Sequence, residues 1–179
     1  ELGCALAKLG TKVTVIEGMD DVLAMMDKEI RRPLEIWLKK HGVKIYRNAL
    51  ARGAERIESS GEGKIRLKYE MGGENHSIDV DKILVTVGRK ANLSGWGLEE
   101  TGVRLGPDGR FIRTDRKCRT NIPGVYAIGD VSGEPMLAHK ARAEGEMVAE
   151  IISGLEREFD KVAIPAIVFT EPEIVSVGL

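Results

Sequence analysis

The strongest constraint on the fold is the alternation of helix-like and strand-like segments in residues 1–46. Residues 1–10 are predicted to form a helix that ends at Gly10, and Lys12–Ile16 (KVTVI) is a β-branched run typical of a buried strand. A second helical pattern begins at Asp27, and Val43–Tyr46 is predicted to be another short strand. Because two strands joined through a helix run parallel, this order predicts an α/β fold with a parallel sheet.

Two further segments are expected to extend the sheet structure. Ile65–Tyr69 alternates apolar with charged residues, and Gly72-Gly73 is expected to turn the chain back toward Ile78–Val80. This pattern predicts a half-exposed antiparallel hairpin. Lys82–Val87 (KILVTV) is apolar enough for a central strand. The first half of the chain is therefore predicted to be a parallel sheet with an antiparallel insertion.

Pro33 lies inside the second helical pattern. Its ring nitrogen carries no hydrogen, so it donates no hydrogen bond to the preceding turn. We therefore expect Pro33 to delay or kink the first turns of that helix.

The second half of the chain is predicted to be rich in loops. Residues 89–119 contain few periodic segments, and Val125–Ile128 is predicted to be a buried strand. A helix is expected from about Leu137 to Ser153, and a further strand-rich segment begins at Ala163. The inner side of this helix is predicted to consist of Ala141, Val148, Ile151 and Ile152.

Composition excludes several classes of function. A net charge of -1 and 4% aromatic residues give no basic face and no stacking platform for nucleic acid. Apolar runs of about six residues at most are far shorter than the roughly 20 needed to span a bilayer. No metal is expected, because neither the histidines nor the cysteines have the spacing of metal ligands; the histidines are His41, His76 and His139. Cys4 and Cys118 also form no disulfide framework, which favours a reducing compartment.

The two ends of the chain suggest an internal piece of a longer protein. The sequence opens in the body of a predicted helix with no cap before it, and it stops directly after a strand-like run at Leu179. We therefore expect residues to precede Glu1 and to follow Leu179.

Glu17 is the first candidate ligand-binding residue. It follows the strand Lys12–Ile16, and an acidic residue at that place in a dinucleotide-binding unit accepts hydrogen bonds from ribose hydroxyls. The glycine-rich loop of such a unit is expected just before Glu1. Residues 18–21 contain no Lys or Arg, so a 2′-phosphate would meet only negative charge, which favours NAD over NADP. The alternative is a strand-end glutamate that merely faces solvent.

Gly129-Asp130 is the second candidate. A glycine allows close approach of a ligand, and a carboxylate at the end of a strand is able to accept from ligand hydroxyls. The segment Met136–His139 follows at a predicted helix start, where backbone N–H groups carry partial positive charge that suits the edge of a flavin ring. The alternative is an ordinary turn followed by a helix cap.

Five segments together resemble the pyridine nucleotide-disulfide oxidoreductases, and the resemblance covers essentially the whole chain. They are ELGCALAKLGTKVTVIEG, ILVTVGRKAN, NIPGVYAIGDV, MLAHKARAEG and IPAIVFTEPEIVSVGL. The resemblance implies partial Rossmann-like FAD- and NAD(P)-binding domains in three layers, followed by the start of an α+β interface domain. It also implies domain ranges of 1–87 for NAD binding, 88–158 for the second half of the FAD domain, and 159–179 for the interface domain that makes a homodimer.

The resemblance also implies cofactors, partners and contact residues. Electrons from dihydrolipoyl groups, carried by 2-oxo acid dehydrogenase or glycine cleavage complexes, would pass through a redox disulfide and FAD to NAD. The disulfide and the catalytic histidine would lie outside this chain, which would leave no catalytic residue in it and make it inactive alone. The compartment would be the cytoplasm of a bacterium or archaeon, or the mitochondrial matrix of a eukaryote. The residues implied to contact NAD are Glu1, Glu17, Ala51 and Gly88, and those implied to contact FAD are Asp130, Met136, Leu137, Ala138 and His139.

Two other readings stay open at this stage. One is an NADH oxidase or another NAD-linked disulfide reductase with the same scaffold. The other is a module without catalytic activity that binds a nucleotide. A Cys-x4-Cys pair before Glu1 would favour the lipoyl-oxidising enzyme.

Overall fold

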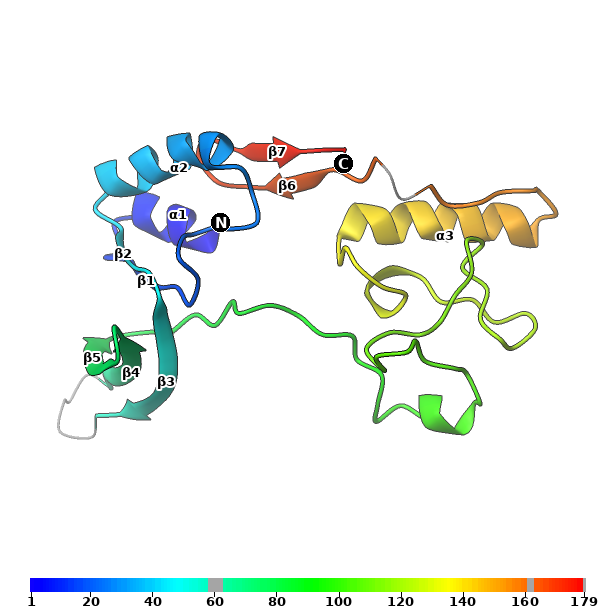
Figure 1. Ribbon diagram of the computed structural model, residues 1–179, viewed down its shortest axis with the longest axis horizontal. Coiled ribbons are helices and arrows are strands. Elements are labelled where there is room, and N and C mark those ends of the chain that lie inside the picture. Colours follow the sequence, from blue (N-terminus) through cyan, green and yellow to red (C-terminus); the bar gives the residue numbers. More distant parts are fainter. Residues whose placement is uncertain (58–62, 161–162, 179) are drawn as a thin grey trace. The chain divides into compact units, whose positions relative to one another are not determined.

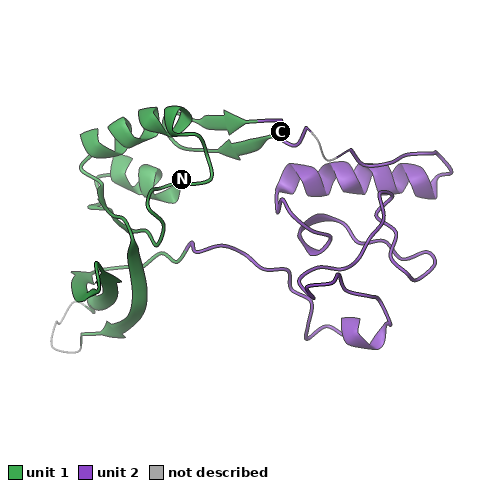
Figure 2. Ribbon diagram, viewed as in Figure 1, with its two compact units in different colours: residues 1–85, 165–176 green, residues 86–164, 177–179 purple. Residues whose placement is uncertain are grey.

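The computed structural model describes residues 1–57, 63–160 and 163–178. The chain divides into two compact units, which Figure 2 shows in different colours. The first unit contains residues 1–85 and 165–176, and the second contains residues 86–164 and 177–179. Each unit has its own apolar core.

The first unit contains the predicted strand–helix–strand order. β1 (Thr14–Ile16) and β2 (Lys44–Tyr46) are parallel, with Val15 opposite Ile45, and α2 (Lys28–Lys40) lies between them in the sequence (Figure 1). The prediction of a parallel α/β arrangement is confirmed. The buried core of this unit consists of Cys4, Leu34, Leu38, Val43 and Ile174.

α1 (Leu2–Lys8) has Leu9 as its C-cap residue and is followed by Gly10, the glycine that the sequence predicts at the helix end. Gly10 has φ +88°, its N–H donates to the Ala7 carbonyl at 3.0 Å, and the next N–H, of Thr11, donates to the Leu6 carbonyl at 3.0 Å. This pair of bonds satisfies carbonyl groups that the helix leaves without partners, and it needs a left-handed residue at Gly10. The chain is thereby turned directly into the approach to β1.

Pro33 does not delay the helix, so that part of the prediction was wrong, and the alternative of a kink stays a prediction. α2 begins at Lys28, directly after its N-cap Asp27. The N–H groups of Ile30 and Arg31 both donate to the Asp27 carbonyl at 3.1 Å, which closes the first turn before Pro33 is reached. Proline therefore removes one bond from a helix whose start is already held.

The predicted hairpin is present, but it belongs to a sheet of three antiparallel strands. β4 (Ile65–Met71) and β5 (Glu74–Val80) are joined through Gly72 and Gly73, whose φ angles are +62° and +81°. β3 (Ala49–Arg56) pairs with the other edge of β4 and was not predicted. Its sequence, ALARGAER, contains no β-branched or aromatic residue, so it lacks the usual signal of a strand.

Lys82–Val87 does not form the predicted central strand. Among the described residues no strand pairs with this segment, and Leu84, Val85 and Val87 are 54%, 73% and 91% exposed. An extended segment becomes a strand only when a neighbouring strand takes up its backbone hydrogen bonds. The apolar composition is typical of a strand with neighbours on both sides, but no such neighbour pairs with this segment among the described residues, so the predicted burial was wrong.

β6 (Ala166–Val168) and β7 (Ile174–Ser176) form an antiparallel pair, which confirms that the segment from Ala163 is rich in strands. The division into three domains stays a prediction.

The second unit is rich in loops, as predicted. Its described residues contain two short 3₁₀ turns, η1 (Leu98–Glu100) and η2 (Gly129–Val131), and one long helix, α3 (Ala138–Ile152). The helix confirms the prediction for this segment. Val148 lies in the core as expected, whereas Ile152 is 68% exposed, so its assignment to the inner side was wrong.

The predicted strand Val125–Ile128 is also wrong. Only Tyr126 makes a bridge, with Arg119, and Val125 and Ile128 are 40% and 38% exposed. Ala127 alone is buried, in a small cluster with residues of the loops. The segment is therefore extended and leads directly into the turn that carries Asp130.

Candidate functional site

Glu17 is held at the carboxyl end of β1. Its N–H donates to the Tyr46 carbonyl at 2.9 Å, and its carbonyl accepts from the Ala49 N–H at 2.8 Å, which joins the ends of β1 and β2 to the start of β3. Its carboxylate accepts a hydrogen bond from the Met19 N–H at 2.9 Å. A carboxylate has about four acceptor sites, so Glu17 retains capacity for ligand hydroxyls.

The fold brings a cation, Arg47, to the same end of this sheet. The residues next to Glu17 in the sequence did not reveal it. Arg47 follows β2 directly, and its Nε lies 2.6 Å from the Asp21 carboxylate. Asp21 also pairs with the buried Arg31 at 3.1 Å. The hydrogen bond from Arg47 lowers the pKa of Asp21 below its ordinary value of 3.8 and outweighs the opposing effect of burial. One Asp21 carboxylate is therefore shared by two guanidinium groups and balances the charge of Arg47 only in part.

The other three residues predicted to contact NAD lie in separate surroundings. Glu1 is the N-cap residue of α1, and its carboxylate accepts from the Phe169 N–H at 2.8 Å. Ala51 is exposed in β3, next to an irregularity in the register between β3 and β4. Gly88 is exposed in the second unit with φ +118°. Glu1 and Ala51 share a unit with Glu17, and Gly88 does not.

Asp130 lies in the middle of η2, directly after Gly129. Gly129 is buried with φ +74°, and a Cβ added to it would lie 3.1 Å from the Cβ of Ala141 in α3. Only glycine lets this turn pack so closely on the helix without strain. The side chain of Asp130 is 43% exposed, so the turn presents a carboxylate at the surface.

Arg89 brings the two predicted FAD segments together. Its Nη1 lies 3.7 Å from Asp130 Oδ2, and its Nη2 donates to the Met136 carbonyl. Sequence reasoning did not select Arg89, although it directly follows Gly88. Its position became visible only when the fold placed residues 89, 130 and 136 side by side.

The start of α3 fits the predicted partial positive charge. Leu137 is the N-cap residue and makes no side-chain cap hydrogen bond. Met136 and Leu137 are half-buried, and Ala138 and His139 are exposed. Backbone N–H groups at such a helix start favour an electron-rich group. Asp130, Arg89 and this helix start therefore form one polar surface that an anionic or hydroxyl-bearing ligand suits.

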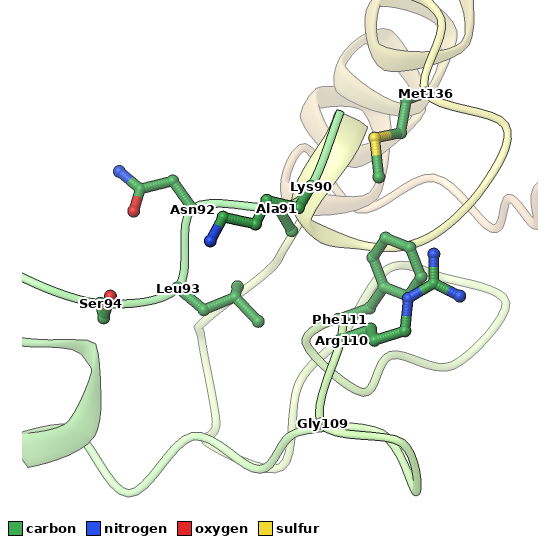
Figure 3. A pocket seen from close by; sticks show the side chains of 9 residues that line it. All are labelled: Lys90, Ala91, Asn92, Leu93, Ser94, Gly109, Arg110, Phe111 and Met136. Atoms are coloured by element: carbon green, nitrogen blue, oxygen red, sulfur yellow. The ribbon is translucent and has the colours of Figure 1, made fainter. Parts of the chain in front are cut away.

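A cavity of about 490 Å³ lies beside this surface and was not predicted from the sequence. Figure 3 shows Met136 at one side of it, with the Phe111 ring opposite. The Arg110 guanidinium lies 5.3 Å from the centre of that ring. The lining residues are Lys90, Ala91, Asn92, Leu93, Ser94, Gly109, Arg110, Phe111 and Met136.

Within the described ranges, no group of three or more His, Cys, Asp or Glu side chains is arranged to hold a metal ion. No helix in the same ranges is long and apolar enough to cross a bilayer.

Comparison with known proteins points to one family. The family model described as pyridine nucleotide-disulphide oxidoreductase matches residues 1–145. The dihydrolipoyl dehydrogenase of Geobacillus stearothermophilus is 46% identical over 178 residues, which are 99% of this chain and 37% of that protein. The enzymes of the same name from Bacillus subtilis and Pseudomonas aeruginosa are 43% and 44% identical over 179 residues, again 37% of each protein.

A solved structure gives the same result for the fold. The crystal structure of LpdA from Mycobacterium tuberculosis matches with a TM-score of 0.87 and 31% identity, over 100% of this chain and 38% of that one. The chain thus spans a little over a third of the length of these relatives. Members of the family use FAD and a pyridine nucleotide, in agreement with the predicted cofactors. The α/β, Rossmann-like fold class is confirmed, and the chain belongs to the pyridine nucleotide-disulphide oxidoreductase family.

Proposed function

We propose that the chain is part of a dihydrolipoyl dehydrogenase that oxidises dihydrolipoyl groups and reduces NAD. The observation that carries the proposal is the identity of 43–46% over at least 99% of the chain with three enzymes of that name. The polar surface formed by Arg89, Asp130 and the start of α3 supports it, because its chemistry suits a flavin nucleotide.

The overall reaction fixes what the protein must handle. The dithiol loses two electrons and two protons, NAD+ takes up a hydride, and one proton is released. FAD, when bound, supplies the electron relay between the two substrates, in concert with a redox disulfide outside this chain. This chain's residues bind and orient the nucleotides, and none of them is proposed to be catalytic.

The FAD contacts are proposed for Asp130 and the segment Met136–His139. Asp130 presents an ionised acceptor for ligand hydroxyls, and charge-assisted hydrogen bonds of this kind are among the stronger ones. The helix start provides partial positive charge toward a flavin ring that becomes more negative on reduction.

The NAD contacts are proposed for Glu17, with Glu1, Ala51 and Gly88. Glu17 stands at the end of β1 with spare acceptor capacity for ribose hydroxyls. Residues 18–21, which follow Glu17 directly, contain no Lys or Arg, which supports the preference for NAD over NADP. Arg47, near the same strand end, is bonded to Asp21 at 2.6 Å. Ala51 would act through its backbone only.

The proposal extends to the organisation of the whole protein. Residues 1–87 would belong to the NAD domain, 88–158 to the FAD domain and 159–179 to an interface domain that makes a homodimer. The physiological substrates would be dihydrolipoyl groups of 2-oxo acid dehydrogenase or glycine cleavage complexes, in the cytoplasm of a bacterium or archaeon or in the mitochondrial matrix.

The test measures two reactions of the natural full-length protein: the formation of NADH from dihydrolipoamide and the consumption of oxygen with NADH. Flavin-containing protein should form NADH from dihydrolipoamide and NAD+, and it should do so faster than it consumes oxygen with NADH as donor. Faster oxygen consumption, without NADH formation from dihydrolipoamide, would instead support the NADH oxidase alternative. Protein that binds nucleotide without either activity would support a non-catalytic module.

A further inference from the structure

Two charged side chains are completely buried beneath the turn that carries Asp130. Lys140 and Glu144 lie one helical turn apart on α3, with side chains 0% and 1% exposed and with Nζ 3.3 Å from Oε1. Removing two charges from water costs several kcal/mol per ion, and apolar residues of similar size would often stabilise a fold equally well. General stability therefore does not explain why this ion pair is buried.

The side-chain hydrogen bonds of this pair reach the turn that carries Asp130. Lys140 Nζ donates to the carbonyls of Gly129 at 3.0 Å and Gly133 at 2.9 Å. Glu144 Oε2 accepts from the Gly129 N–H at 2.7 Å and from the Ser132 hydroxyl at 3.2 Å. Both ends of the segment that contains Asp130 are thus fixed from below.

Gly129 is held most tightly, and it is the residue that precedes Asp130. The pair binds both its N–H and its carbonyl, while the Ser132 N–H also donates to that carbonyl at 3.1 Å. These bonds fix the direction of the backbone from which the Asp130 side chain emerges.

A second ion pair on α3 shows that the spacing alone does not create this arrangement. Arg142 and Glu146 are also four residues apart, at 2.8 Å, but their side chains are 81% and 65% exposed. This pair faces solvent, and its hydrogen bond joins Arg142 to Glu146 along the helix surface. It provides a matched control on the same helix.

We propose that Lys140 and Glu144 are positioning residues for the flavin site, which act through Asp130. The proposal rests on the assignment of Asp130 to FAD. The ion pair holds residues 129–133 in the one conformation that presents the Asp130 carboxylate to the ligand hydroxyls. Loss of the pair therefore lowers FAD affinity only as far as Asp130 contributes to it.

The test is a double-mutant cycle in the natural full-length protein, with the Kd for FAD measured by titration of the apoprotein. Lys140→Met removes the ammonium at similar volume, and Glu144→Gln keeps an acceptor for the Gly129 N–H while removing the charge. Each change should raise the Kd by about tenfold when Asp130 is present. In the Asp130→Ala background the same change should raise it by less than about twofold. Arg142→Met and Glu146→Gln should leave the Kd unchanged in both backgrounds.

Two results would overturn the positioning role. One is an equal rise in Kd with and without Asp130, since the pair would then act independently of it. The other is failure of both Lys140→Met and Glu144→Gln to fold, which would show that the pair serves stability alone.

Full-length protein that binds no FAD overturns this role together with the proposed function. Coupled FAD binding without formation of NADH from dihydrolipoamide leaves the positioning role standing and contradicts only the proposed reaction.

Discussion

The guanidinium of Arg89 lies 3.7 Å from the carboxylate of Asp130 and at the same time donates to the Met136 carbonyl. One side chain therefore joins a turn and a helix start that are separate in the sequence. Arg89 is 62% exposed, so its contacts are worth little for stability, and their main consequence is the arrangement of the surface.

Arg89→Leu should weaken FAD binding without destabilising the protein. The change releases both Asp130 and the Met136 segment, and we expect the Kd for FAD to rise about fivefold, since coupled contacts of this kind contribute roughly 1 kcal/mol. The matched control is Arg116→Leu, which breaks the pair with Glu158 at 3.6 Å. If both variants bind FAD like the parent protein, Arg89 has no part in the site.

Glu17→Arg should move the coenzyme preference toward NADP. The change removes the acceptor for the ribose hydroxyls and adds a cation for a 2′-phosphate. The ratio of kcat/KM for NADP to that for NAD should rise, by about tenfold or more if the ribose bonds contribute as charge-assisted hydrogen bonds do. An unaltered ratio would count against the ribose role of Glu17.

Gly129→Ala should cost more stability than the same change at Gly124. Both glycines have similar φ angles, +74° and +76°, but a Cβ at position 129 would lie 3.1 Å from Ala141, whereas position 124 has nothing within 4 Å. Both variants bear the backbone strain of about 1–2 kcal/mol, and Gly129→Ala adds overpacking of about 1 kcal/mol or more. Denaturant unfolding of the full-length apoprotein measures the difference; equal losses would show that the turn is not packed as described.

Asp21 should make unfolding depend on pH in the acid range. Arg47 lowers the pKa of its carboxyl in the folded state below the ordinary value of 3.8. The stabilisation is therefore complete above the unfolded pKa and is lost as the pH falls through the lower folded pKa. The difference in the free energy of unfolding between the parent and Asp21→Asn should shrink as the pH drops below about 4. A difference that stays constant with pH would rule out this contribution.

The parallel strand–helix–strand order could be predicted from the sequence because its signals are local. A β-branched run forms β1, Ile45 and Tyr46 favour a strand at β2, and Gly10 marks the end of α1. These features depend on residues close in the sequence, so periodicity and turn chemistry are sufficient. The prediction of a central strand at Lys82–Val87 was wrong for the opposite reason. A strand depends on a neighbouring strand, which local composition does not reveal.

The candidate site could be predicted only in part. Glu17 and Asp130 follow extended segments and are recognisable by position. Two arginines reach these places only through the fold. Arg47 pairs with Asp21, which is 26 residues away in the sequence, and Arg89 pairs with Asp130, which is 41 residues away. Lys140 was noted within a motif, but its burial beneath Gly129 could not be read from the sequence, since lysine is rarely buried completely.

The most direct test of the account is the flavin content of Asp130→Ala in the natural full-length protein, measured from the visible absorbance after gel filtration. Loss of an ionised acceptor for ligand hydroxyls should weaken FAD binding by roughly 1.5–3 kcal/mol, which is about 10- to 150-fold in Kd. The control is Glu134→Gln, which removes a nearby carboxylate that is 62% exposed and paired with Arg110. The account predicts that Asp130→Ala loses flavin on the column while Glu134→Gln and the parent retain it. Equal flavin content in all three proteins would contradict the assignment of the Asp130 turn to FAD.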